Sequence, residues 1–320
     1  MKLFCGKVLF FIVILSSILF SVTYLLNNKA QNNQYYRLSP DTKYLFVGSS
    51  FVSCGIRDSE IDGAVNLSLA GESFFYSYPK IRKIIDANPQ LKYIFLDYSN
   101  FKLTKIIDKY MWTDMYLSTQ YLRYAPLFEN SDKLAILTDN PIGFLSIQPM
   151  IARETIGFLE WEGTFYPSYK YWGGYDEFRF SKTDSLIRVN HQSKATHQDI
   201  FEVGPVNLKY LEKIKKLCIE KGVNLILFRT PTHRLDPYRA NEEFFQNYRK
   251  ENLAGITFLD FHNFPLENKE FLDLDHLNYF GATKLSSFLN SLIKDSLWVV
   301  DDKQEYIERN IRLQEIKSDC

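Results

Sequence analysis

A serine, an aspartate and a histidine stand in this sequence in an order and a context that suit nucleophilic catalysis. Ser50 follows a short apolar stretch and Gly48, where a strand is expected to end. Asp273 and His276 lie three residues apart, just before a helical pattern near the C-terminus. A serine hydroxyl is a weak nucleophile unless a base takes its proton, and a carboxylate beyond the imidazole orients that base. The pattern therefore predicts acyl transfer through Ser50, with His276 as base and Asp273 as its orienting carboxylate.

Each of these residues has an alternative. Ser49 is a competing nucleophile, and Asp275 competes with Asp273, although adjacent side chains normally point apart. Ser50 could instead be the N-cap of the helix that follows. Asp273 and His276 could be a helix cap and a surface histidine. The joint order and spacing of the three residues favour the catalytic interpretation.

The elements expected around these residues alternate between strands and helices. Short apolar runs at 44–47, 64–69, 93–96, 223–228 and 256–259 predict strands, and helical spacing at 78–87, 208–221 and 281–292 predicts helices. This alternation, with glycines at the junctions, is typical of a three-layer, doubly wound α/β fold with a parallel sheet. Ligands bind such sheets beyond the carboxyl ends of the strands. Ser50, Gly71, Asn100 and His233 each follow a different predicted strand, so we expect them at one rim.

An aromatic-rich insertion at about 101–200 interrupts this alternation inside a domain expected over 43–298. We expect the insertion to be partly helical and to lie over the active-site rim. Its Tyr171, Trp172 and Tyr175 could stack on sugar rings, because flat rings offer apolar faces. A satellite core beneath the long insertion is the alternative. Residues 299–320 form a charged C-terminal tail.

The N-terminal region predicts a membrane anchor. No charged residue occurs from Val8 to Leu26, and as a helix this stretch spans roughly 28 Å, enough for a bilayer core. Lys2 and Lys7 precede it, which favours a cytoplasmic N-terminus and an exported C-terminal domain. A cleaved signal peptide and a buried core helix are the alternatives, but no small-x-small cleavage site follows Leu26. We therefore expect a single-pass anchor in the cytoplasmic membrane over residues 1–26 and a polar linker over 27–42.

Composition narrows the function classes. The formal net charge is zero and no basic run stands out, so nucleic-acid binding lacks its electrostatic footprint. No GxGxxG or Walker loop supports a nucleotide cofactor. His191 and His197 are six residues apart in a polar segment, and neither they nor the cysteines have metal-ligand spacing. We therefore expect neither a cofactor nor a metal.

The two motifs together resemble the SGNH/GDSL superfamily of esterases and acyltransferases. In that family a Gly-Asp-Ser carries the nucleophile and a C-terminal Asp-x-x-His completes the triad. Here Gly48-Ser49-Ser50 stands in the first place and Asp273-Leu-Asp-His276 in the second. Gly-Ser-Ser is similar to the membrane-anchored branch that includes the teichoic-acid D-alanine transfer protein and the alginate O-acetylation proteins. The resemblance covers 43–100 and 222–292 and implies an SGNH/flavodoxin-like fold.

The resemblance also implies an oxyanion hole and a class of substrate. The backbone N–H groups of Ser50 and Gly71 are two expected donors, and Asn100 is the third. The family's Gly-x-Asn-Asp block is altered here to Asp97-Tyr-Ser-Asn100, without the glycine. The implied function is a membrane-anchored esterase or O-acyltransferase acting on acyl groups of a cell-envelope glycan or lipid, beside a multi-span acyl carrier protein. A simple lipid or acetyl esterase is a second enzyme hypothesis, and a non-catalytic envelope binding or assembly module is the alternative class.

Overall fold

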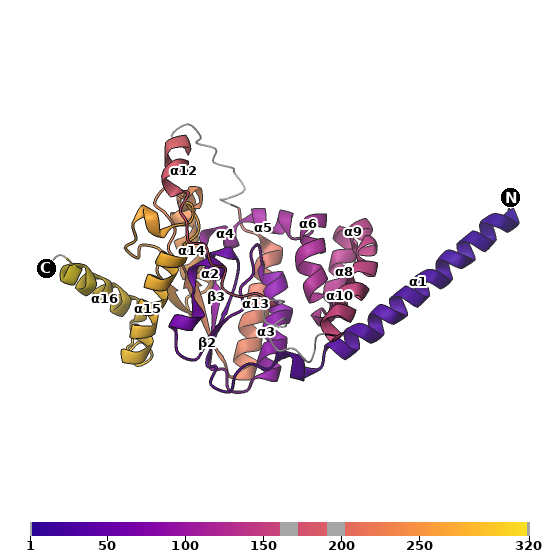
Figure 1. Ribbon diagram of the computed structural model, residues 1–320, viewed down its shortest axis with the longest axis horizontal. Helices are drawn as coiled ribbons and strands as arrows, with labels where there is room; N and C mark the ends of the chain where they lie inside the picture. The colour runs from indigo at the N-terminus through magenta and orange to yellow at the C-terminus, as the bar shows by residue number, and fades with distance from the viewer. Residues whose placement is uncertain (1, 161–171, 191–201, 319–320) are drawn as a thin grey trace. The chain divides into compact units, whose positions relative to one another are not determined.

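The chain forms two compact units (Figure 1). The computed structural model describes residues 2–160, 172–190 and 202–318. The first unit, called the helical unit below, comprises Met1–Arg37, Pro79–Asn88 and Lys109–Tyr171. The second, called the sheet unit, comprises Leu38–Tyr78, Pro89–Asp108 and Trp172–Cys320.

The sheet unit is built on five parallel strands in the order β2-β1-β3-β4-β5. From β1 the chain places β2 on one side and then β3, β4 and β5 on the other side, so the direction of strand addition reverses once. The predicted doubly wound α/β fold is therefore confirmed. The strands are β1 (Tyr44–Val47), β2 (Ala64–Asn66), β3 (Tyr93–Asp97), β4 (Asn224–Arg229) and β5 (Thr257–Asp260). β2 ends at Asn66, earlier than predicted, although the N–H groups of Leu67 and Leu69 still donate to Phe46 O and Gly48 O of the segment around β1.

One face of the sheet carries a largely aromatic core. Phe46 and Phe95 stack with ring centroids 4.3 Å apart, and Phe228 meets both edge-on. Helix α15 (Tyr279–Asp295) packs on this face through apolar residues such as Leu285 and Leu289. Helix α16 (Lys303–Ser318) adds Tyr306 and Ile307 to the same core, so part of the charged tail is built into the sheet unit.

The other face is covered where helix α13 (Pro205–Lys221) contacts β4. Its buried residues follow the predicted spacing and include Leu208, Leu211, Ile214 and Cys218. Gly222 ends the helix with φ +67°, a left-handed conformation that glycine adopts without strain. The remaining elements with bounds in the sheet unit are α2 (Ser50–Gly55), η2 (Asp58–Glu60), α4 (Asn100–Leu103), α12 (Thr183–Asn190), η6 (Pro237–Asn241), α14 (Glu242–Asn252) and η7 (Asn268–Glu270).

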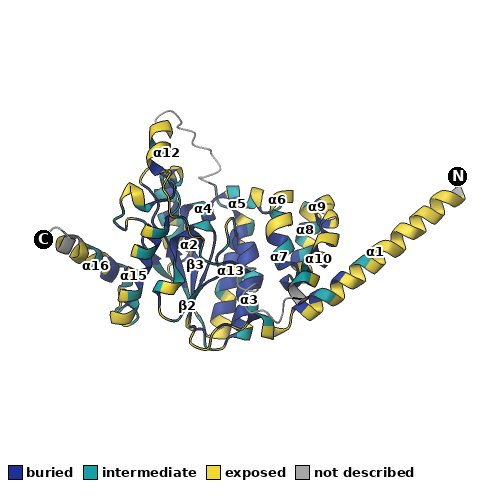
Figure 2. Ribbon diagram, in the orientation of Figure 1, coloured by how far each residue is buried: buried dark blue, intermediate teal, exposed yellow. Residues whose placement is uncertain are grey.

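The helical unit contains α1 (Lys2–Ala30), which is long and apolar enough to cross a membrane. Most of α1 is exposed and yellow in Figure 2, whereas most residues of β1 and β3 are buried. Part of the predicted insertion groups with α1 in this unit. Its elements are η1 (Asn33–Tyr36), α6 (Asp114–Tyr116), the π-helical turn η3 (Leu117–Tyr121), α7 (Leu122–Tyr124), η4 (Ala125–Leu127), α8 (Asn130–Asp139), α9 (Pro141–Ser146) and α10 (Gln148–Glu160); α3 (Phe74–Ala87) and α5 (Lys105–Tyr110) run from one unit into the other.

Two of the three predicted sugar-stacking aromatics pack against other residues of the sheet unit. Trp172 is buried, and Tyr175 packs against the core of the sheet unit. These contacts fit the satellite-core alternative for the two residues. Tyr171 lies outside the described residues, as do His191 and His197.

Candidate active site

The two adjacent serines after β1 have different partners. Ser49 is the N-cap of α2, and its hydroxyl donates to Asp97 Oδ2 at 2.5 Å. Its backbone N–H donates to the same oxygen at 3.1 Å. Ser50 begins α2, and its Oγ lies 2.7 Å from His276 Nε2. The geometry therefore holds Ser49 against β3 and leaves Ser50 as the serine that meets the histidine.

Asp273 contacts the opposite side of the same imidazole. His276 Nδ1 lies 2.9 Å from Asp273 Oδ1 and 3.1 Å from Oδ2. Because Nδ1–H donates to this carboxylate, Nε2 is free to accept the Ser50 proton. Asp275 instead donates its backbone N–H to Asp273 Oδ1 at 2.9 Å. The structure thus brings together the three residues singled out in the sequence, in the arrangement of a catalytic triad.

The loop that carries Asp273 and His276 is fixed at both ends. Leu272 N–H donates to His276 O at 2.9 Å, which folds the loop back on itself as a turn. Asn278 caps α15 by accepting the N–H groups of Phe280 and Gly281. A Cβ on Gly281 would lie 2.2 Å from Glu270 O, so only glycine allows the helix to start so close to the loop. The carboxylate and the base are therefore presented by a rigid turn.

Negative charge around His276 raises its pKa. Burial lowers the pKa of the imidazole, but the hydrogen bond and charge of Asp273, with the charges of Asp275 and Asp236, outweigh burial. Burial raises the pKa of Asp273, and its bonds to His276 outweigh this, leaving it below its ordinary value. Burial and the neighbouring Asp275 raise the pKa of Asp236 to about 7. The site favours a histidine that holds a proton during the reaction.

Two backbone donors are available for an oxyanion. In the part of the chain that the structure describes, the N–H groups of Ser50 and Gly71 have no hydrogen-bond acceptor. Gly71 has φ +75°, a conformation that glycine adopts freely. Such donors stabilise a developing negative charge when they point at its position.

Asn100 does not join these donors. Its Nδ2 donates to Asn241 Oδ1 at 2.9 Å and to Glu242 Oε2 at 3.0 Å. Its Oδ1 accepts a hydrogen bond of 2.8 Å from Arg229. Both amide hydrogens are therefore engaged elsewhere, and this geometry does not support the predicted third oxyanion donor.

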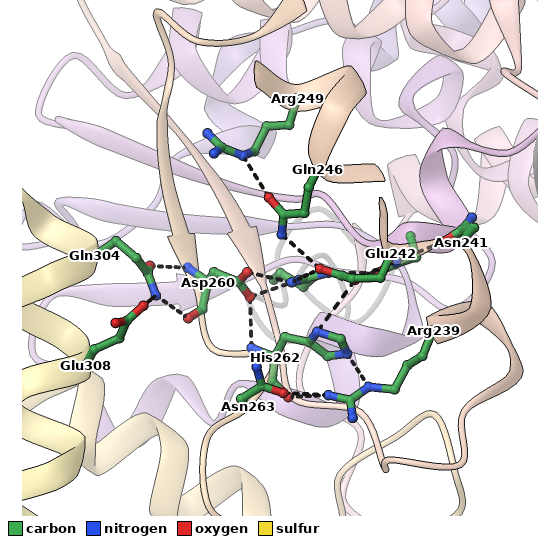
Figure 3. Close-up of polar contacts among 12 residues, drawn as sticks. Arg239, Asn241, Glu242, Gln246, Arg249, Asp260, His262, Asn263, Gln304 and Glu308 are labelled. Carbon is green, nitrogen blue, oxygen red and sulfur yellow. Dashed lines mark hydrogen bonds and ion pairs between the residues drawn. The ribbon is translucent and has the colours of Figure 1, made fainter. Parts of the chain in front are cut away.

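Asn100 bonds instead to Arg229 and Glu242. These two residues form a charged cluster with Asp260 at the ends of β4 and β5, and Figure 3 labels Glu242 and Asp260. Arg229 is buried and bonds both Glu242 and Asp260. Burial raises the pKa of Glu242, but its bonds with Arg229 prevail and bring it down to about 2. Burial, Arg229 and Arg239 lower the pKa of His262 to about 4, so this histidine is neutral and accepts from Arg239 at its Nε2. The cluster ties β4 and β5 to α14 beside the site.

A second buried charge supports the serine turn. Lys102 is fully buried, and its Nζ lies 3.7 Å from Asp97 Oδ2 and donates to Glu72 O. Burial lowers the pKa of Lys102. Asp97 thus accepts from Ser49 while paired with Lys102. The sequence analysis did not predict that Asp97 holds Ser49. The usable signal was a charged residue directly after the apolar strand predicted at 93–96.

Residues 173–182, called the strap below, form neither helix nor strand and border the site. Gly174 N–H donates to Ser68 O, and Asp176 bonds Ser53 through both its backbone N–H and its carboxylate. Lys182 N–H donates to Leu272 O at 2.7 Å. The strap therefore bonds the segment after β2, helix α2 and the loop of the base. These residues belong to the insertion predicted at about 101–200.

His233 supports the base loop from the other side. It is buried, its backbone N–H donates to Leu274 O at 2.9 Å, and its Nε2 lies 3.1 Å from Asn268 Oδ1. Burial lowers its pKa. These bonds give His233 a structural role in holding the loop that carries Asp273 and His276.

Comparison with known proteins gives three findings. One protein-family model matches residues 182–298, which is less than half of the chain. No curated protein matches the chain. Six chains of solved structures match, among them one described as "a putative platelet activating factor from Streptococcus pneumonia". That structure is 13% identical, covers 90% of this chain and 98% of its own, and has a TM-score of 0.35.

Proposed function

We propose that the protein is an SGNH-like serine esterase or O-acyltransferase. The observation that carries this proposal is the hydrogen-bonded series from Ser50 Oγ through His276 to Asp273, with 2.7 Å between Ser50 Oγ and His276 Nε2. The parallel sheet and the order of the motifs along the chain support it. The resemblance noted in the sequence names the same superfamily.

The reaction proceeds through an acyl-enzyme. Ser50 Oγ forms a bond to the ester carbonyl carbon while His276 Nε2 takes the hydroxyl proton. The carbonyl oxygen becomes an oxyanion, which the N–H groups of Ser50 and Gly71 stabilise. The intermediate then expels the alcohol, which leaves with the proton from His276. Water or a sugar hydroxyl attacks the acyl-enzyme in the reverse sense, and Ser50 regains its proton.

Helix α1 serves in this proposal as an uncleaved membrane anchor. Thr23, Asn27 and Ala30 are buried along one face of α1, and Thr155 Oγ1 lies 3.3 Å from Asn27 Oδ1. Cleavage after α1 would remove these contacts from the helical unit. Packing of the C-terminal end of α1 therefore supports retention of the helix, with the remainder of the chain on the exported side of the cytoplasmic membrane.

The proposed substrate is an acyl group on a cell-envelope glycan or lipid. An exported, anchored position and the family resemblance support this class. A multi-span acyl carrier protein in the membrane would supply the acyl chain if the acceptor is a sugar hydroxyl. A non-catalytic envelope module is the second candidate, favoured by one observation: both amide hydrogens of Asn100 are engaged away from the oxyanion position.

Two serine variants separate catalysis from binding. Ser50→Ala and Ser49→Ala each remove one oxygen from adjacent residues, but only Ser50 meets His276. The full chain, in detergent, would be assayed on a short-chain aryl ester, and glycan acylation would be measured in cells carrying each variant. We expect loss of both activities in Ser50→Ala and retention in Ser49→Ala. Full activity of Ser50→Ala in cells would favour the non-catalytic module, whereas loss in cells without ester hydrolysis by the wild type would indicate a transferase that needs its own donor.

The members of a catalytic triad act as a unit, so the same assay can also test whether the effects of single and double variants are additive. His276→Ala should be about as damaging as Ser50→Ala, and the double variant should be little worse than either. Additive losses would contradict a shared proton-transfer role for the two residues.

A further inference from the structure

We propose that an apolar face of helices α9 and α10 lies in the lipid interface on the exported side of the membrane. The inference concerns the helical unit alone and rests on the proposed membrane anchor. It assigns a lipid surface as the partner of this face. The unit would then be held by α1 and by a second, shallow contact with the same bilayer.

The depth of α10 follows from its packing on α1. Thr155 of α10 bonds Asn27 of α1, and both residues are buried. Charge-free residues of α1 run through Asn28, and at about 1.5 Å per residue Asn27 lies only about 1.5 Å along the axis beyond Leu26. If Val8–Leu26 spans the hydrocarbon core, the contact with Thr155 falls at its boundary. Helices that lie in an interface sit within roughly 5–10 Å of this boundary.

The polypeptide next to this contact is unusually apolar and exposed. Residues 141–152 include no charged side chain. Ile142 is 81% exposed and Leu145 is 53% exposed, and both belong to α9. Met150 and Ile156 of α10 are also exposed, at 39% and 41%, and the exposed Arg153 lies between them on the same side of the helix. Soluble surfaces carry such residues singly, whereas a group of them marks a contact surface.

The internal packing of the unit explains why these residues remain outside. Phe144, Ile147 and Ile151 on the same helices are buried and form its interior. Gly143 N–H donates to Asn140 Oδ1 at 2.9 Å, which caps the start of α9. The exposed apolar residues of α9 and α10 are therefore additional to those that form the interior of the unit. Continuity with α1 makes the bilayer the occupant that fits.

Single cysteines on the full-length protein test this placement. Cys5→Ser and Cys320→Ser would remove the terminal thiols, while Cys54 and Cys218 are buried and their pKa values are raised to about 12, so they resist labelling. An environment-sensitive fluorophore would be placed at Ile142→Cys or Leu145→Cys. Leu15→Cys in α1 is the membrane reference, and the exposed Ser59→Cys in the sheet unit is the aqueous control. Each protein would be reconstituted into phosphatidylglycerol-containing vesicles with spin-labelled lipids.

We expect the spin-labelled lipids to quench the fluorophore at positions 142 and 145, as at position 15, and to leave position 59 bright. Quenching at position 15 with none at 142 and 145 would overturn the inference and leave the anchor intact. No quenching at position 15 would overturn the anchor as well. A third outcome would also contradict the proposal. If the fluorophore at positions 142 and 145 is bright in vesicles, but these cysteines are shielded from a water-soluble thiol reagent in native membranes, the face binds a membrane protein.

Discussion

Ser49 and Asp97 make two hydrogen bonds to each other, both at Asp97 Oδ2. The Ser49 hydroxyl donates at 2.5 Å and the Ser49 backbone N–H at 3.1 Å. These bonds fasten the residue before Ser50 to the end of β3. They require β1 and β3 to approach closely at Gly48, where an added Cβ would lie 2.1 Å from Asp97 Cβ.

Gly48→Ala should therefore damage the turn that presents Ser50. The added methyl group overlaps a side chain that is itself held by hydrogen bonds, and such overpacking typically costs about 1–3 kcal/mol or more. Gly157→Ala is the matched control. Among the described residues outside its own helical turn, no atom lies within 4 Å of the added Cβ, and alanine favours the helix by about 1 kcal/mol. Denaturant unfolding should show a loss for Gly48→Ala and no loss for Gly157→Ala. Equal stability of the two variants would contradict the close approach.

Removing Lys102 alone should be costly. Lys102→Met leaves the buried Asp97 carboxylate without its cation, and breaking a buried pair in this way costs about 3–5 kcal/mol. The double variant Lys102→Met with Asp97→Asn should cost less than the sum of the single changes, because no unpaired charge remains. Chemical denaturation of all four proteins gives the coupling energy. Simple additivity would show that the two groups do not stabilise each other.

Much of the sheet unit could be predicted because its signals are local. Runs such as 44–47 and 93–96 are apolar on both faces, as expected for central parallel strands, and all five predicted strands form. The position of Ser50 follows from that order, since carboxyl ends of parallel strands share one rim. The three-residue spacing of Asp273 and His276 could be read because a single turn brings them together.

Other features depend on contacts between distant residues, which leave no periodic signal. The position of Asn100 after β3 suggested an oxyanion donor. Its side-chain amide instead forms hydrogen bonds with Arg229 and Glu242, which are far away in the sequence. The burial of Lys102 likewise depends on Asp97 and Glu72. Tyr306 and Ile307 lie in a charged stretch whose weak helical spacing concealed two core residues.

The acidic limb of the pH–rate profile should respond to Asp275. Catalysis needs neutral His276, so activity falls as the pH drops through its pKa, which the surrounding carboxylates raise. Asp275→Asn removes one negative charge, destabilises the imidazolium and lowers this pKa. The acidic limb of kcat/KM should therefore shift to lower pH with little loss at its plateau. Asp273→Asn should shift the limb in the same direction but also lose most of the plateau, because the ring loses its orienting partner. A shift to higher pH in Asp275→Asn would contradict this account.

The topology of the chain can be measured independently of activity. Lys2 and Lys7 precede the apolar stretch of α1, so a reporter fused after Cys320 should be active only in the exported compartment. Intact-mass measurement of the membrane fraction should find the mature chain with α1 retained. Reporter activity in the cytoplasm, or a mature N-terminus near Asn27, would contradict the anchor.

Covalent capture of the nucleophile tests the central claim most directly. A serine-reactive phosphonate forms a stable bond only with a hydroxyl that a base has activated. The wild-type protein in detergent should gain the mass of one phosphonyl group, and fragmentation of the peptide containing Ser49 and Ser50 should place it on Ser50. His276→Ala should abolish the adduct, while Ser49→Ala should retain it. An adduct on Ser49, or none on a folded wild-type protein, would contradict a Ser50-centred acyl-transfer site.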